Sequence, residues 1–236
     1  MPDSQPTIVL VHGAFAESAS WNGVIERLGA AYDVVAAANP LRGVAGDAAY
    51  VRDVIRGIGG PVVLVGHSYG GMVITQAAAD ESSVRALVYV NAFAPETGES
   101  ALSLSGKFPG STLADTLVQY PLSSGGNEVA IGQDAYHAQF AADVSSDLAA
   151  LMARTQRPIT EQALSDGLSG APAWRSLPSW FVFGDADLNI PVAAHRFMAE
   201  RAEPRGQREI VGGSHAMAAA QPGEIAETII EAVRGS

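Results

Sequence analysis

The most constraining feature of this sequence is the regular order in which short apolar runs and longer amphipathic segments follow one another. Six runs are rich in β-branched or aromatic residues, and in most of them apolar side chains fill consecutive positions: Thr7–Val11, Asp33–Ala38, Pro61–Val65, Ala86–Val90, Ser179–Phe183 and Arg208–Val211. Apolar runs without strict alternation are typical of strands that are buried on both faces of a parallel sheet.

Segments with helical spacing of apolar residues lie between these runs or close the chain: Ser20–Ala30, Ala48–Ile58, Gly71–Ala79, Val192–Ala202 and Pro222–Val233. A repeated strand–helix order favours a doubly wound α/β fold, because each helical crossover returns the chain to a parallel strand. The sequence therefore predicts a mainly parallel six-stranded sheet that is flanked by helices.

The strand–helix order is interrupted between residues 95 and 172. This stretch is rich in serine, glycine and alanine, but it contains several aromatic residues, and Asp134–Arg154 has helical periodicity. A disordered linker is the alternative interpretation, which the aromatic residues and the periodicity disfavour. A long insertion after a strand lies on the side where open α/β sheets bind ligands. We therefore predict a core of residues 1–94 and 173–236, and a cap insertion of residues 95–172.

The composition excludes several classes of function. The chain has 236 residues, which suits one domain, and 14 basic against 25 acidic residues give a net charge of −11. Such a surface repels nucleic acid and anionic membranes, so we expect neither as a partner. The chain has no cysteine, which excludes disulfides, thiolate nucleophiles and cysteine-bound zinc. No targeting segment is evident, so we expect a cytoplasmic protein; the oligomeric state stays open.

The strongest motif is Gly66-His67-Ser68-Tyr69-Gly70, which matches the nucleophile-elbow pattern G-x-S-x-G. An apolar run precedes the motif and a helical segment follows it, as the pattern requires. Glycines allow the backbone to turn sharply there and expose the Ser68 hydroxyl above the sheet. The alternative is an ordinary glycine-rich turn with a capping serine, and only further motifs can decide between the two.

A serine nucleophile also needs two backbone N–H groups aimed at the oxyanion that forms on the substrate. In elbow folds one comes from the residue after the nucleophile, here Tyr69, and the other from the loop after an early strand. That loop is His12-Gly13-Ala14-Phe15. We expect Ala14 to supply the second N–H group, with Phe15 as the less favoured alternative. His12 is interpreted as a residue that orders the loop.

One of the five histidines should act as the general base. His67 adjoins the nucleophile and points elsewhere, whereas His137 and His195 lie in predicted helices, where a surface or core role is expected. His215 follows two glycines in the loop after the last predicted strand, at the same sheet edge as Ser68. We therefore predict that His215 is the base rather than a solvent-exposed loop residue.

A carboxylate should orient the histidine, and the chain order Ser, acid, His places that carboxylate after the fifth strand. Gly184-Asp185-Ala186-Asp187 offers two candidates there. We favour Asp187, three residues beyond Gly184. Asp185 lies nearer the end of the strand, where its side chain is expected to bond its own loop as an Asx turn.

Together, the VHGAF, GHSYGG, FGDADLNIP and GGSHAM segments resemble the α/β-hydrolase superfamily over nearly the whole chain. The chain is most similar to the branch that holds plant methyl-ester esterases and hydroxynitrile lyases, with their bacterial relatives. The resemblance implies the α/β-hydrolase fold and a triad of Ser68, Asp187 and His215. It also implies an oxyanion hole formed by the N–H groups of Ala14 and Tyr69.

We therefore expect a serine esterase that forms an acyl-enzyme and hydrolyses small to medium carboxylic esters, with a small-molecule ester as its partner. A hydroxynitrile lyase, a lactonase or a perhydrolase on the same fold is the alternative, and a non-enzymatic small-ligand binder is the remaining one. Gly57-Ile58-Gly59-Gly60 precedes a strand and opens no helix, and the chain has neither a P-loop nor an H-E-x-x-H motif. No metal or nucleotide cofactor is implied.

Overall fold

A computed structural model describes residues 5–236 and places six parallel strands in one sheet. The strands are β1 (Thr7–Val11), β2 (Val34–Ala37), β3 (Val62–His67), β4 (Val84–Val90), β8 (Ser179–Gly184) and β9 (Gly206–Ile210). Their order across the sheet is β2-β1-β3-β4-β8-β9. The predicted mainly parallel six-stranded sheet is confirmed, and its strand ends lie within two residues of the expected ones. β3 continues through His67, so Ser68 is the first residue after it.

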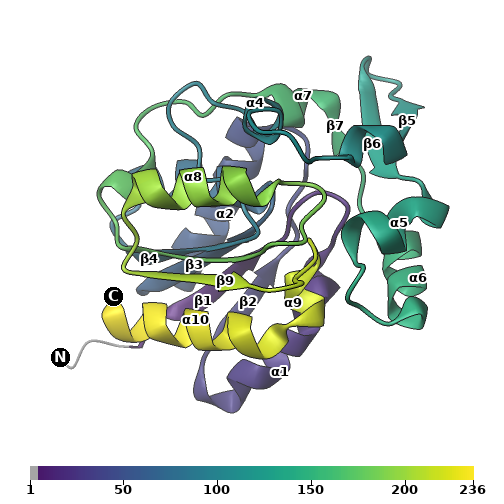
Figure 1. The fold of residues 1–236 in the computed structure, drawn as a ribbon. Coiled ribbons are helices and arrows are strands. Elements are labelled where there is room, and N and C mark those ends of the chain that lie inside the picture. Colours follow the sequence, from purple (N-terminus) through teal and green to yellow (C-terminus); the bar gives the residue numbers. More distant parts are fainter. Residues whose placement is uncertain (1–4) are drawn as a thin grey trace.

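Helices cover both faces of the sheet, as Figure 1 shows. α1 (Asn22–Leu28) and α10 (Pro222–Gly235) lie below the sheet in this view, and α2 (Val44–Ile58) and α8 (Val192–Ala202) lie above it. α3 (Gly70–Ala77) belongs to the same hydrophobic cluster as α2 and α8. Short 3₁₀ helices and one further helix complete the core: Ser18–Trp21, Gly29–Ala31, Ala78–Asp80, Ala173–Arg175 and α9 (Met217–Ala220).

The two faces are packed by alternate residues of the central strands. In β1, Ile8 and Leu10 join the cluster that holds α1 and α10, whereas Val9 and Val11 join the cluster on the opposite face. All four side chains are fully buried. Because successive side chains of a strand point to opposite faces, a strand that is covered twice must be apolar at every position. This explains the unbroken apolar runs of the sequence.

Residues 95–172 form a separate layer of short elements at the right of Figure 1 and above the sheet. Three strands pair antiparallel in the order β5-β6-β7. The elements of this segment are α4 (Ala101–Ser105), a 3₁₀ turn (Leu113–Thr116), β5 (Leu117–Pro121), β6 (Asn127–Ile131), α5 (Gln133–Phe140), α6 (Ser146–Thr155), β7 (Ile159–Thr160) and α7 (Glu161–Ser165). No pattern in the sequence indicated this small sheet.

The helix predicted over Asp134–Arg154 is wrong as one continuous element, because the chain turns between α5 and α6. Ser145 caps α6 by accepting a hydrogen bond from Leu148 N (3.4 Å), and His137 Nε2 donates to Val144 O (2.9 Å). The Asp143 carboxylate in this turn accepts hydrogen bonds from the side chain and the backbone N–H of Ser214. Periodicity alone does not reveal such a break, since apolar residues continue on both sides of it.

The two ends of this segment lie together against the core. Trp174 Nε1 donates to Pro95 O at 2.9 Å, and Gly98 N donates to Leu168 O at 2.9 Å. Buried residues of β6, α5 and α6 belong to the same hydrophobic cluster as the upper face of the sheet. The segment therefore packs as a continuation of the core. Within residues 5–236, no helix combines the length and the apolar character that a membrane crossing needs.

The glycines after Ser68 allow α3 to approach neighbouring backbone closely. A Cβ on Gly70 would lie 2.3 Å from Val11 O, and a Cβ on Gly71 would lie 2.1 Å from Phe93 O. Both distances are far below ordinary contact, and a backbone carbonyl cannot move away as a flexible side chain can. Glycine is therefore required at both positions for packing.

We expect Gly71→Ala to lower the free energy of unfolding by about 3 kcal/mol or more, because the new methyl group overlaps the Phe93 carbonyl. Gly57→Ala is the matched control, because Gly57 lies in α2 and a Cβ there would point into open space. This control should be neutral or stabilising by about 1 kcal/mol. Urea unfolding of both variants measures the difference, and equal stabilities would contradict the packing described here.

Candidate active site

Ser68 lies on a sharp turn between β3 and α3. Its φ is 53°, a left-handed value that is uncommon for residues other than glycine. Its N–H donates to Val90 O (3.3 Å), and its carbonyl accepts from Gly71 N (2.9 Å) and Phe93 N (3.2 Å). These contacts hold the strained conformation, as is typical of functional turns. A Cβ on Gly13 would lie only 2.6 Å from Ser68 Cβ, so the loop after β1 passes directly beside the serine.

His215 and Asp187 meet in the interior, at the edge of the sheet where β8 and β9 end. His215 Nδ1 donates to Asp187 Oδ2 at 2.7 Å, and both side chains are buried. His215 Nε2 is buried and has no hydrogen-bond partner among residues 5–236. With Nδ1 carrying the proton, the neutral ring presents an unprotonated Nε2. This is the state in which a histidine can accept a proton from a nucleophile.

Asp187 carries a negative charge in spite of its burial. Burial alone would raise the pKa of its carboxyl, but the neighbouring His215 and His195 and their hydrogen bonds hold that pKa well below its usual range. Its Oδ1 accepts from the backbone N–H groups of Asn189 (2.8 Å) and Ile190 (2.9 Å). A carboxylate with several donors remains ionised, because each donor stabilises the charged form.

Asp185 has a different environment. Its Oδ1 accepts from Gly212 N at 2.6 Å, on the loop that follows β9, and the residue is exposed. The expected Asx turn within its own loop is therefore replaced by a bond to the neighbouring loop. The structure thus brings Asp187, and not Asp185, to His215.

His215 contacts His67, the residue before Ser68, and no hydrogen bond joins Ser68 to His215 among the described residues. The ring centroids of His67 and His215 lie 4.9 Å apart, and His67 Nε2 donates to His215 O at 2.9 Å. His67 is itself buried, and its side chain contacts Trp21 and Phe140 rather than solvent. Hydrogen bonds between catalytic groups are often long or absent until substrate binds. The hydrogen bond from the His67 side chain thus ties the turn at Ser68 to the loop that carries His215.

The backbone N–H groups beside Ser68 differ in their availability. Phe15 N donates to Arg157 O at 3.0 Å, which removes Phe15 as a donor to substrate. Ala14 N and Tyr69 N make no hydrogen bond to any part of the chain that the structure describes, and both residues line the same pocket as Ser68. His12 Nδ1 donates to Gly13 O at 2.9 Å, in line with the predicted ordering of this loop.

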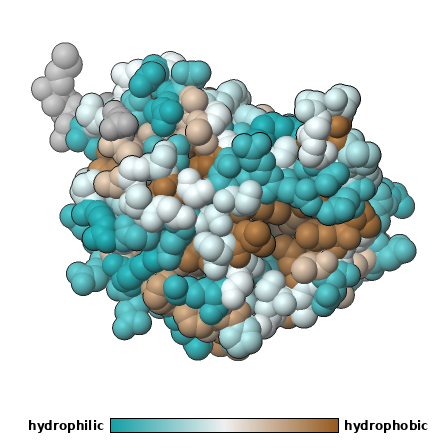
Figure 2. All heavy atoms as spheres, turned by 90° about the horizontal axis from the view of Figure 1, so that it is seen from above, coloured by the Kyte–Doolittle hydropathy of each residue, from teal (hydrophilic) through white to brown (hydrophobic). Residues whose placement is uncertain are grey.

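The pocket at Ser68 has a volume of about 290 Å³ and a mainly apolar lining. Its walls come from the turns after β1, β3 and β4, from α4, and from the segment leading to β5. Figure 2, which looks onto the molecule from above, shows hydrophobic residues gathered around a hollow on this face. None of the described residues that line the pocket carries a charge. Such a site favours neutral, apolar groups.

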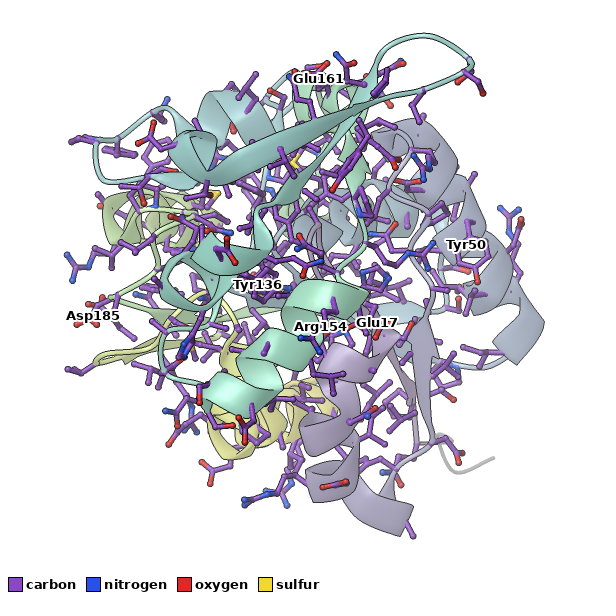
Figure 3. All side chains as sticks on the ribbon, turned by 90° about the vertical axis from the view of Figure 1, so that its right-hand side faces the viewer. Glu17, Tyr50, Tyr136, Arg154, Glu161 and Asp185 are labelled. Atoms are coloured by element: carbon purple, nitrogen blue, oxygen red, sulfur yellow. The ribbon has the colours of Figure 1, made fainter. Side chains whose placement is uncertain are left out.

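Tyr136 connects the inserted segment to the loop after β1. Its hydroxyl donates to Phe15 O at 2.7 Å, and its ring stacks on Phe140 with the centroids 4.9 Å apart. Figure 3 views the molecule from the side of the inserted segment and shows Tyr136 in its middle, with Asp185 at the edge of the molecule. The inserted segment therefore supports the loop that carries Ala14.

Asn91 and His195 belong to the site, although the sequence analysis did not predict this. Asn91 follows β4, and its Nδ2 donates to Asp187 Oδ2 (3.1 Å) and to Ser214 O (2.8 Å). His195 Nε2 donates to Asp187 Oδ2 at 3.1 Å. His195 was expected in a surface or core role, and its burial fits the core alternative. Neither residue belongs to a recognisable motif, so only the folded chain reveals their contacts.

Comparison with known proteins places the sequence in a family. The model of the alpha/beta hydrolase family matches residues 8–228. The chain belongs to the alpha/beta hydrolase family. This confirms the resemblance drawn from the motifs. Among the described residues of this hydrolase-family protein, no group of three or more His, Asp or Glu side chains is arranged to hold a metal ion.

Several relatives carry esterase names. The solved structure of polyneuridine aldehyde esterase is similar with a TM-score of 0.82 and 21% identity, over 97% of this chain and 99% of that one. A methylesterase from Arabidopsis gives a TM-score of 0.81 and 15% identity, over 98% and 100% of the two chains. A carbendazim-hydrolysing esterase of Nocardioides sp. (strain SG-4G) is 56% identical over 48 residues, which is only 20% of this chain and 19% of that esterase.

We expect Asp187→Asn to lower kcat by about 10⁴, because an amide at this position favours the wrong tautomer of His215. Asp185→Asn is the matched control and should change kcat by about tenfold at most, since its side chain bonds only the Gly212 backbone. Steady-state kinetics on p-nitrophenyl acetate compares the two variants. A larger loss in Asp185→Asn would contradict the arrangement described here.

Stability should fall in acid, partly because of His67. Burial, aided by the nearby His215, lowers the pKa of His67 from 6.5 to about 3. Below pH 6.5, His67 therefore binds a proton in the unfolded chain but not in the folded chain. The free energy of unfolding then decreases by up to about 1.4 kcal/mol for each pH unit of acidification. His67→Gln keeps a donor to His215 O and should flatten this dependence between pH 6.5 and pH 4. Urea unfolding measures the free energy of unfolding of both proteins against pH, and parallel curves would contradict the role given to His67.

Proposed function

We propose that this protein hydrolyses small to medium carboxylic esters through an acyl-enzyme on Ser68. The observation that carries the proposal is the buried pair of His215 and Asp187, whose 2.7 Å hydrogen bond leaves His215 Nε2 without a partner beside the nucleophile turn. A buried basic nitrogen without a partner is costly unless a ligand or a reacting group uses it. A serine on a strained elbow, with two free N–H groups nearby, is such a reacting group.

The proposed reaction has two halves. His215 Nε2 takes the proton of the Ser68 hydroxyl while Ser68 Oγ attacks the carbonyl carbon of the ester. The N–H groups of Ala14 and Tyr69 stabilise the negative oxygen, and collapse of this intermediate releases the alcohol, which receives the proton from His215. In the second half, His215 takes a proton from the water that attacks the acyl-enzyme. It then returns this proton to Ser68 Oγ as the bond to the acyl group breaks and the acid leaves. Asp187 stabilises the charged His215 in both halves and remains deprotonated throughout.

The shape of the pocket supports substrates of limited size with apolar groups. The pocket of about 290 Å³ at Ser68 adjoins a more open cavity of about 600 Å³, and both share Leu102, Ala114, Leu117 and Leu164 in their walls. Glu161, which Figure 3 shows beside the strands of the inserted segment, lines the outer cavity. The esterase names of the similar proteins agree with an ester substrate. We also propose that residues 95–172, the predicted cap, select the substrate.

The charges around the site favour ester hydrolysis over hydroxynitrile lysis. Cleavage of a cyanohydrin releases cyanide, an anion that a nearby fixed cation would stabilise. His215 is followed by Ala216 and Met217, and neither can supply such a charge. Lys107, the only lysine of the chain, places Nζ 4.8 Å from the centre of the Phe197 ring of α8. The described lining of the Ser68 pocket contains no cation.

We expect a fluorophosphonate probe to label the protein once, at Ser68, and Ser68→Ala to abolish both labelling and the hydrolysis of p-nitrophenyl acetate. The reason is that Ser68 lies on the strained elbow and lines the apolar pocket together with Ala14 and Tyr69. Ser20→Ala is a matched control, because the Ser20 hydroxyl only donates to Glu17 O within a helical turn. Intact-mass spectrometry and peptide mapping locate the label.

The original protein and Ser68→Ala also distinguish ester hydrolysis from cyanohydrin cleavage. Release of cyanide from mandelonitrile should not exceed that of the buffer, because the pocket lacks a cation. Rapid cyanide release that depends on Ser68 would overturn the esterase proposal. Labelling at another serine, or none on folded protein, would favour a binding protein without catalysis.

A further inference from the structure

Asp187 Oδ2 accepts hydrogen bonds from three side chains, and only one of them belongs to the proposed triad. The donors are His215 Nδ1 (2.7 Å), Asn91 Nδ2 (3.1 Å) and His195 Nε2 (3.1 Å). They come from three separate parts of the chain: the loop after β9, the end of β4 and the first turns of α8. A second histidine on the carboxylate is not required by the proposed reaction steps and needs an explanation.

His195 is built into this position by burial and stacking. Its side chain is 1% exposed, and its ring lies parallel to that of Phe183 in β8, with the centroids 5.1 Å apart and an interplanar angle of 11°. Because Asp187 is an acceptor, Nε2 of His195 must carry the proton of this hydrogen bond. The first turn of α8 therefore holds the donor in place, and the Phe183 ring packs beside it.

We propose that His195 is a positioning residue of the active site, which holds Asp187 Oδ2 toward His215 and weakens the pull of its charge on that histidine. This inference rests on the proposed function. Rotation about the last bond of an aspartate side chain is soft, so the carboxylate plane must be fixed by its partners. Asn189 N and Ile190 N hold Oδ1, and His195 together with Asn91 holds Oδ2.

The second part of the inference concerns charge. Each donor draws negative charge from the carboxylate, so His195 makes Asp187 a weaker partner for a protonated His215. The charged and titratable groups that the structure places around His195 and His215 include Asp187, His67, whose ring lies 4.9 Å from that of His215, Glu209 on β9, and Arg196, which pairs with Glu209. Without the His195 bond, the Asp187 carboxylate has one donor fewer and becomes a stronger acceptor for the N–H of a protonated His215, which favours that protonated form. The neutral, active form of His215 then requires a higher pH.

Two variants of His195 and one of Phe183 test the inference. His195→Phe removes the donor and keeps a ring beside Phe183, whereas His195→Gln restores an N–H donor. Phe183→Leu weakens the stacking but leaves His195 able to donate, so it controls for a purely structural role. Steady-state kinetics on p-nitrophenyl acetate, from about pH 5 to about pH 9, gives kcat and KM separately and locates the acid limb of kcat/KM.

We expect His195→Phe to lower kcat by about 10- to 100-fold, as is usual when a residue that orients a catalytic group is lost. KM should stay within about twofold, since His195 does not line the Ser68 pocket. The acid limb of kcat/KM should move to higher pH. His195→Gln should recover most of kcat and return the limb toward that of the original protein, and Phe183→Leu should leave the limb in place.

A readout without substrate separates this inference from the proposed function. The low-field proton resonance of His215 Nδ1–H reports the bond to Asp187, and it should shift or broaden in His195→Phe but not in His195→Gln. Equal effects of the two substitutions on kcat, with an unmoved acid limb and an unchanged resonance, would assign His195 to packing alone. A protein that hydrolyses no ester but shows the expected resonance change would refute the esterase proposal and keep the positioning role.

Discussion

The site depends on one physical constraint: a carboxylate is buried in the interior and must remain charged. An ion that leaves water loses several kcal/mol of solvation, which only close donors and opposite charge can offset. Five donors meet Asp187, from the turn after β8, the end of β4, α8 and the loop after β9. These elements are held together by the same parallel sheet. The pairing of β4, β8 and β9 thus determines whether the site exists at all.

A second set of contacts places the turn at Ser68 against this centre. The turn approaches the loop after β1 so closely that glycine is required at positions 13 and 70, and it is bonded to the histidine loop through His67. The inserted segment contributes as well. Phe140 O accepts from Ala216 N at 2.9 Å, and Asp143 accepts from Ser214, so the turn between α5 and α6 supports the residues on both sides of His215. The inserted segment therefore helps to hold the loop that carries His215.

The sequence could predict the parts of this arrangement that depend on local pattern. Apolar runs locate the central strands, since a strand buried on both faces favours apolar side chains throughout, whereas the edge strands β2 and β9 are partly exposed. The elbow motif and the chain order of Ser68, Asp187 and His215 follow from where strands end. The small sheet β5-β6-β7 could not be predicted from the sequence. Its strands are short, and β5 is mostly exposed, so apolar and polar residues do not alternate along it. The roles of Asn91 and His195 were equally hidden, since each depends on a contact between distant segments.

The most direct test of this account is a crystal structure of the protein after reaction with a small alkyl phosphonate, which mimics the tetrahedral intermediate of ester hydrolysis. The account predicts phosphorus bonded to Ser68 Oγ, with one phosphonyl oxygen about 3 Å from both Ala14 N and Tyr69 N. It also predicts that His215 Nε2 lies within hydrogen-bond distance of Ser68 Oγ or of the leaving-group oxygen, with the bond to Asp187 retained. An adduct on another residue, or a phosphonyl oxygen turned away from both N–H groups, would contradict it.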